Sequence, residues 1–127
     1  MINNAIITIH KTKFDFRFGI GFLGRLLKRV DLDISEVLQE VSKNPFEMIP
    51  VIMYESAKYG FDRKGEECEY TVYDFIDFID ADGGIQSKSI EKFLKAFTNS
   101  IIEDVPKEEG TVKKIKAPSK KQTGAVK

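Results

Sequence analysis

The first eighteen residues alternate between apolar and polar side chains, and this period of two limits the fold more than any other feature of the sequence. Because successive side chains of a β-strand point to opposite faces, the pattern predicts two strands that share one apolar face. The residues of that face are Ile7, Ile9, Phe14, Phe16 and Phe18. The connector from His10 to Lys13 lacks the Asn-Gly or Asp-Gly pair expected of a two-residue turn, so the sequence leaves the turn geometry open.

An isolated two-stranded hairpin is marginally stable in water, so the rest of the chain must cover its apolar face. After the hairpin, apolar residues recur at helical spacing in five segments. These run from about Gly21 to Val30, from the cap Asp33 through Val41, from Asn44-Pro45 to Gly60, from the cap Thr71 to Gly83-Gly84, and from Ser87 to Val105-Pro106. The predicted fold class is therefore α+β, mainly α, with an N-terminal β-hairpin followed by about five short helices.

Two N-caps and one internal proline bear on the helix boundaries. Asp33 with Glu36 three residues later forms a capping-box pattern, and Thr71 caps the fourth segment. Pro50 would remove a backbone hydrogen bond, so the third helix either kinks there or has Pro50 in its first turn. The expected buried stripes of the last two helices are Val72, Phe75, Ile76 and Ile79, and Ile90, Phe93, Leu94, Phe97 and Ile101.

Length and composition indicate one soluble domain. A chain of 127 residues with 42% hydrophobic positions is long enough to fold without help from metals or disulfides. Its single cysteine, Cys68, excludes an internal disulfide framework. No apolar run approaches the length of a membrane span and the N-terminus lacks a signal-peptide pattern, so we expect a cytoplasmic protein that does not bind membranes.

Basic and acidic residues are equal in number, 20 of each, but they are unevenly distributed. Residues 106–127 carry seven Lys against two Glu and few apolar groups, so we expect a single domain over 1–105 and a flexible, disordered Lys-rich tail. The stretch from Gly65 to Ser87 holds seven carboxylates and no Lys or Arg. The tail could lie against this stretch, bind an acidic partner or simply stay solvated and aid solubility. The lysines that could make such contacts are Lys113, Lys114, Lys116, Lys120 and Lys121.

The run from Gly19 to Gly24 matches the G-x-G-x-x-G phosphate-binding pattern and lies between a strand and a helix. That pattern also needs a parallel sheet to hold a dinucleotide, and a short, mostly helical chain with an antiparallel hairpin has none. The preferred interpretation is structural. Gly19 and Gly21 turn the chain sharply and let the following helix approach the hairpin closely.

The sequence contains no group of residues typical of catalysis or metal binding. The Asp80 to Gly84 run with Glu91 is similar to a calcium loop, but Ile85 stands where that loop needs glycine. His10 has no second histidine, and the acidic neighbours of Cys68 disfavour a thiolate. The other carboxylates fit a solvated helix face, and the acidic body argues against specific nucleic-acid binding. We therefore predict no catalytic residue, no metal and no cofactor.

Several segments in order resemble the tail assembly chaperones of long-tailed bacteriophages. The most distinctive is Phe14 to Leu23, where a glycine pair is flanked by phenylalanines. It is followed by a leucine-bearing helix ending Lys28-Arg29, then Asn44-Pro45 with Val51 to Tyr54 and Ala57, then the Thr71 to Ile79 segment. The resemblance covers residues 1 to about 80, and the last helix more loosely.

This resemblance implies a non-enzymatic protein that keeps the helical, apolar tape measure protein soluble and helps recruit tail tube protein around it. Such proteins act in the host cytoplasm and are not expected in the mature virion. A longer form often arises in the family by translational frameshifting near the end of the reading frame, and this chain would then be the short form. Self-association is a further possibility.

A chaperone for amphipathic helices needs an apolar groove with side chains that can repack. The candidate partner-binding residues are Phe22, Phe46, Met48, Met53, Tyr54, Tyr73 and Phe78, each of which is equally compatible with an ordinary core or surface position. Two other functions stay open: a generic protein-interaction adaptor, and a nucleotide-binding module that uses Gly19 to Gly24.

Overall fold

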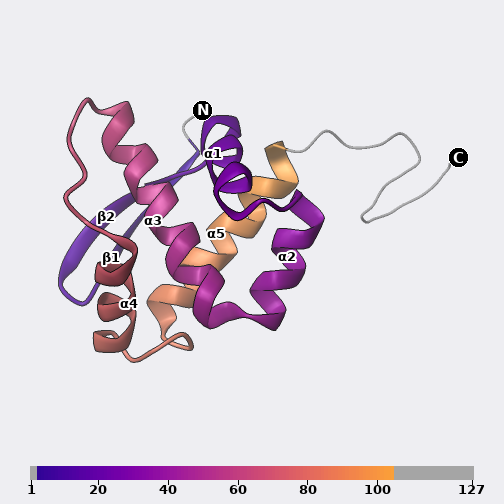
Figure 1. Ribbon diagram of the computed structural model, residues 1–127. Coiled ribbons are helices and arrows are strands. Elements are labelled where there is room, and N and C mark those ends of the chain that lie inside the picture. Colours follow the sequence, from indigo (N-terminus) through magenta and orange to yellow (C-terminus); the bar gives the residue numbers. More distant parts are fainter. Residues whose placement is uncertain (1–2, 105–127) are drawn as a thin grey trace, which may run out of the picture.

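The computed structural model describes residues 3–104 and has the predicted α+β, mainly α architecture (Figure 1). A two-stranded antiparallel hairpin is followed by five helices. The elements are β1 (Asn4–Ile9), β2 (Thr12–Arg17), α1 (Ile20–Val30), α2 (Ile34–Lys43), α3 (Pro45–Arg63), α4 (Val72–Ala81) and α5 (Lys88–Asp104). The Lys-rich tail expected over 106–127 lies outside the described residues. Among those that are described, no helix has both the length and the apolar character needed to cross a bilayer.

The hairpin has the predicted apolar face. Its register pairs Asn4 with Arg17 and Ile9 with Thr12, and the five predicted face residues are all buried. Only His10 and Lys11 connect the strands, with positive φ values of 46° and 72°. Two consecutive residues with positive φ are typical of a type I′ turn, which matches the twist of a hairpin. The two-residue connection therefore forms without Asn or Gly.

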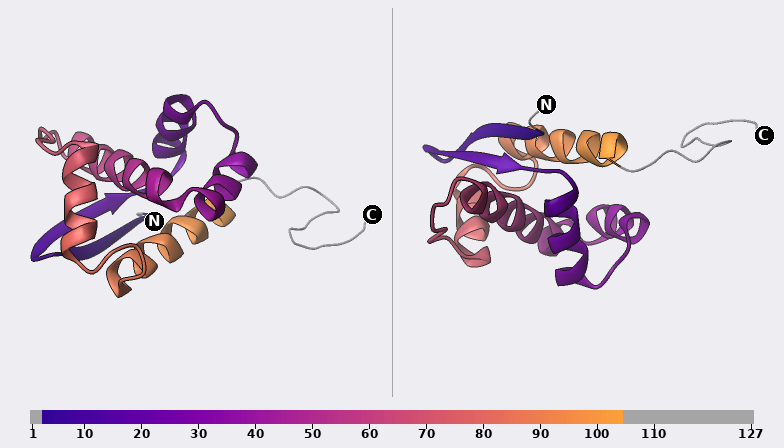
Figure 2. Two further views of the ribbon diagram at one scale, coloured as in Figure 1. Left: turned by 60° about the horizontal axis from the view of Figure 1, so that its bottom comes forward. Right: turned by 90° about the horizontal axis from the view of Figure 1, so that it is seen from above.

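The molecule has two layers, with the hairpin and α5 in one and α1 to α4 in the other (Figure 2, right). The phenylalanines of β2 point between these layers. The Phe14 ring lies 5.1 Å from Phe75 of α4, and the Phe16 ring lies 4.8 Å from Phe93 of α5. The hairpin face is thus covered by helices, as its marginal stability requires, with α4 over Phe14 and α5 over Phe16.

Both predicted capping patterns are confirmed. The Asp33 carboxylate accepts a hydrogen bond from the backbone N–H of Glu36 at 2.8 Å, and the Glu36 carboxylate accepts one from the N–H of Asp33 at 2.9 Å. Thr71 and Asp74 form the same reciprocal pair at the start of α4. These side chains satisfy N–H groups that a helix leaves without intrahelical partners.

The prediction that the third helix ends at Gly60 is wrong, because α3 continues to Arg63. Gly60 instead lets α3 approach the hairpin: a Cβ atom at this position would lie 2.5 Å from the backbone oxygen of Asp15. The question left open at Pro50 is also resolved. Pro45 occupies the first turn, and Pro50 is a buried residue inside the helix.

The buried face of α4 differs from the expected stripe. Phe75 and Ile79 are buried, but Ile76 is exposed, while Phe78 is half-buried and contacts the Phe14 ring. Pairing with the hairpin rotates the buried face toward Phe78. The stripe of α5 is confirmed, with Leu94 at its half-buried margin and its other four residues buried.

Candidate functional site

The glycine-rich turn after β2 is explained by contacts within the protein. Gly19 has a φ of 111° and turns the chain into α1, as expected. A Cβ atom on Gly21 would collide with the Tyr59 side chain of α3, so the prediction that this glycine approaches the hairpin is wrong. Gly19 is therefore explained by the turn and Gly21 by its close contact with Tyr59, which removes the main reason to assign a phosphate site here.

Two arginines of α1 pack against α3 through the same pair of interactions. The Arg25 guanidinium lies 5.2 Å from the Tyr59 ring centre and 2.6 Å from the Asp62 carboxylate. One turn later, Arg29 lies 5.1 Å from the Tyr54 ring centre and 2.9 Å from the buried Glu55 carboxylate. The hydrogen bond from Arg25 lowers the pKa of Asp62 below its usual value. Both guanidinium groups are thus already paired within the fold.

The Asp80 to Gly84 run forms a turn between α4 and α5. The Asp82 carboxylate accepts hydrogen bonds from the backbone N–H of His10 at 3.1 Å and from the Ser87 hydroxyl at 2.9 Å. Burial alone would raise the pKa of Asp82, but these hydrogen bonds outweigh it and lower the pKa. Within residues 3–104, no three His, Cys, Asp or Glu side chains are grouped so that they could hold a metal ion.

Three of the seven candidate partner-binding residues belong to the core. Phe22 and Met53 are completely buried, and Met48 is almost so. Phe22 packs its ring edge-on to Phe18 at 5.5 Å and to Phe97 at 6.0 Å. The prediction that these three residues line a surface groove is therefore wrong, because their side chains pack inside the core.

The other four candidates reach the surface to different degrees and do not form one groove. Phe46 in the first turn of α3 and Tyr73 in the first turn of α4 are each 78% exposed. Tyr54 is half-buried beneath Arg29. Phe78 is half-buried and lines a pocket of about 440 Å³.

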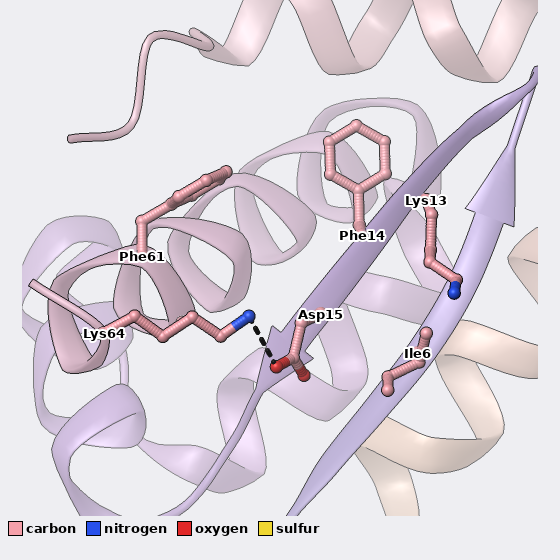
Figure 3. Close-up of a pocket in the computed structure, with 7 residues that line it drawn as sticks. Ile6, Lys13, Phe14, Asp15, Phe61 and Lys64 are labelled. Carbon is pink, nitrogen blue, oxygen red and sulfur yellow. Dashed lines mark ion pairs between the residues drawn. The ribbon is translucent and has the colours of Figure 1, made fainter. Parts of the chain in front are cut away.

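One surface pocket, of about 210 Å³, lies where α3 meets the outer face of the hairpin (Figure 3). Lys64 points from the end of α3 toward Asp15, and its Nζ lies 3.1 Å from that carboxylate. Asn4 also donates a hydrogen bond to Asp15 at 2.7 Å. Burial alone would raise the pKa of Asp15, but these two partners outweigh it and lower the pKa. The only carboxylate of this pocket is therefore used in holding α3 to the hairpin.

The pocket of about 440 Å³ adjoins the first one, because Phe61 lines both. We call it the acidic aromatic pocket. It is lined by three rings and three carboxylates: Phe61, Tyr70, Phe78, Glu67, Glu69 and Asp74. Tyr70 joins the rings, with centroids 6.2 Å from Phe61 and 5.6 Å from Phe78.

Of these six residues, the sequence had singled out only Phe78 as a candidate. The acidic stretch was visible, but nothing in its pattern showed that Glu67 and Glu69 lie beside aromatic rings. Phe61 was missed because the third helix was expected to end one residue earlier. The apolar side chain directly after Gly60 is the signal that could have indicated a longer helix.

Comparisons of the chain with protein-family models, with curated proteins and with solved structures found no match.

Proposed function

We propose that this chain is a tail assembly chaperone of a long-tailed bacteriophage, a non-enzymatic protein that binds the tape measure protein and assists recruitment of the tail tube protein. The proposal is supported by the sequence resemblance over residues 1 to about 80. The order of a hairpin, a glycine turn and a short helix agrees with the segments that carry the resemblance. In this role the chain acts in the host cytoplasm and does not remain in the mature virion.

The observation that carries the proposal is the exposure of Phe46 and Tyr73. Aromatic side chains are common anchors in protein interfaces, where they fill pockets on the partner. Neither side chain is needed for the core, which is closed by the hairpin phenylalanines and the helices that cover them. A partner that supplies apolar surface would therefore gain from covering both rings without disturbing the fold.

The exposed face of α4 suits an amphipathic helical client. Tyr73 and Ile76 are three residues apart and so are neighbours on the helix surface, and both are exposed. Asp77 and Asp80 are exposed on the same helix. A client helix with an apolar stripe bordered by Lys or Arg would match this combination.

Co-expression with the tape measure protein encoded beside this chain tests the proposal. We expect the tape measure protein to be soluble with the wild-type chain and to precipitate without it. The double variant Phe46→Ser and Tyr73→Ser should keep the melting temperature of the wild type but lose the client. Ile20→Ser is the matched control, because Ile20 is equally exposed but is not a proposed contact.

Two results would contradict the proposal. The first is a tape measure protein whose solubility does not depend on this chain, which would favour a generic adaptor. The second is a melting temperature that rises with nucleoside phosphates and loses this response in Gly24→Ala, where the added methyl group meets nothing within 4 Å; this would favour a nucleotide-binding module. Sedimentation of the purified chain, with and without the Phe46 and Tyr73 substitutions, tests whether the same surface also causes self-association.

A further inference from the structure

The acidic aromatic pocket combines two features that recognise the same ligand chemistry. It is lined by aromatic rings, a residue type that can attract a cation, and by carboxylates, which can pair with an ammonium group. A lysine side chain satisfies both, because its aliphatic stem packs on apolar surface while its charged end stays among acceptors.

The carboxylates of this pocket have no cationic partner within the described part of the chain. The four ion pairs among residues 3–104 use Asp15, Glu55 and Asp62, none of which lines the pocket. Asp74 accepts hydrogen bonds from Thr71 in the capping box, which leaves Glu67 and Glu69 unpaired. The three carboxylates line one pocket, so a cation bound there would be attracted by all of them.

The chain itself supplies suitable cations. Its last 22 residues carry seven lysines and two glutamates, whereas residues 1–105 have an excess of five acidic residues. The charges of the two parts are therefore complementary. We infer that the acidic aromatic pocket binds lysine side chains of the chain's own segment 107–121, within the same molecule.

The length of the segment permits this contact. The path from the end of α5 to the pocket runs back along α5 and then along α4. At 1.5 Å per helical residue, this path is about 40 Å long. The bond between Ser87 and Asp82 keeps the facing ends of the two helices together. Lys121 comes 17 residues after Asp104, and an extended chain of that length spans about 55 Å. The segment is therefore long enough for Lys120 and Lys121 to reach the pocket.

Zero-length coupling of carboxylates to amines in the full-length chain, followed by mass spectrometry, tests the inference. We expect cross-links that join Glu67 or Glu69 to lysines of 107–121. The variant Glu67→Gln with Glu69→Gln should lose them. The matched control Asp77→Asn with Asp80→Asn removes the same charge from the exposed face of α4 and should keep them. Cross-links spread equally over Asp77, Asp80 and the pocket would overturn the inference, because they would indicate unspecific attraction between charged regions.

A mixture of unlabelled and ¹⁵N-labelled chains shows which molecule supplies the lysine. Cross-linked peptides that combine the two labels would overturn the assignment to the same chain. In the absence of such mixed pairs, the contact is intramolecular. Raising the salt concentration to 1 M, where the Debye length is about 3 Å, should reduce the cross-linking yield.

A second measurement does not depend on cross-linking. Changing the five lysines from Lys113 to Lys121 to glutamine should shift the backbone amide resonances of Glu67, Glu69 and Tyr70 and leave those of α2 unchanged. A synthetic peptide of residues 107–121 added to this variant should restore the resonances, and a peptide with norleucine in place of lysine should not. Identical spectra of the variant and the wild type would overturn the inference. These experiments need no client, so their outcome is independent of the proposed chaperone function.

Discussion

At Gly60 the backbone of α3 touches the backbone of β2, and a single hydrogen atom in place of a side chain makes this contact possible. The hairpin and the longest helix approach each other at this position. Gly24, in the middle of α1, has the opposite surroundings, since a Cβ atom there would meet nothing within 4 Å. The two glycines therefore have opposite effects on stability although both are helical.

The substitution Gly60→Ala should destabilise the protein by about 1–3 kcal/mol, because the new methyl group would meet backbone that cannot move aside. Gly24→Ala should stabilise it by about 0.5–1 kcal/mol, because alanine loses less conformational entropy in a helix. Urea denaturation of both variants and the wild type measures these changes. Similar free energies of unfolding for the two variants would contradict the close approach at Gly60.

Asp15 should make the stability depend on pH. Its pKa is lowered in the folded protein from the usual value of 3.8, so its charged form favours folding. This contribution is fully present above the unfolded pKa near 4 and is lost as the pH falls through the lower, folded pKa. We expect Asp15→Asn to be less stable than the wild type at pH 7, and the difference to shrink as the pH falls below the usual pKa of 3.8 and to disappear once Asp15 is protonated in the folded protein.

Urea denaturation at a series of pH values from 7 to about 2.5 measures this difference. Asp77→Asn is the control, because Asp77 is exposed and forms no ion pair within residues 3–104. A gap between Asp15→Asn and the wild type that stays constant over the whole range would show that the carboxylate charge is not what stabilises the contact.

At the scale of elements, the hairpin turn contains two of the three non-glycine residues with positive φ within residues 3–104. His10 and Lys11 both adopt positive φ, a conformation that costs L-residues roughly 1–2 kcal/mol each. The bond from the His10 N–H to Asp82 and the bond from the Ser89 hydroxyl to the Thr8 carbonyl, at 3.1 Å, hold the turn region against the start of α5. Contacts with a distant element therefore support a turn that its own residues do not favour.

The double substitution His10→Asn and Lys11→Gly should stabilise the protein by about 1 kcal/mol, because Asn-Gly is the preferred pair of a type I′ turn. It keeps the backbone N–H that bonds Asp82. Lys11→Val should act in the opposite direction, since a β-branched residue tolerates positive φ poorly. Melting temperatures of the two variants provide the measurement, and a lower value for the Asn-Gly variant would contradict the assigned turn.

For the whole molecule, the single core predicts cooperative unfolding. Phe93→Ala should cost about 3–5 kcal/mol, because this completely buried ring contacts the hairpin phenylalanines. Phe46→Ala should change the free energy of unfolding by less than about 0.5 kcal/mol, since its ring is exposed. Circular dichroism and tyrosine fluorescence should give one coincident transition for each variant. Separate transitions would indicate that the hairpin and the helices unfold independently.

Local patterns predicted most of the fold and little of the candidate site. The period of two identified the hairpin face, and the caps Asp33 and Thr71 placed the starts of α2 and α4, because each signal lies within a few residues of sequence. The extension of α3 past Gly60 and the rotation of α4 away from Ile76 could not be predicted in the same way. Both depend on packing against a hairpin more than 40 residues earlier in the chain.

The same reason applies to the surface. Phe22, Met48 and Met53 were expected in a groove because residue type does not distinguish a core stripe from a binding stripe. The acidic aromatic pocket depends on Phe61 and Tyr70 meeting across a loop, with ring centroids 6.2 Å apart. Only the assembled structure brings such side chains together.

The pairing of the first element with the last has a consequence for how the protein is made. The hairpin is synthesised first, but the Phe16 ring is covered by Phe93 only after α5 has been synthesised. Nascent chains that lack α5 should therefore expose the apolar face of the hairpin and be readily cleaved by cellular proteases. The core therefore cannot be completed while the chain is still being synthesised, and the native state should form only after nearly the whole domain has left the exit tunnel.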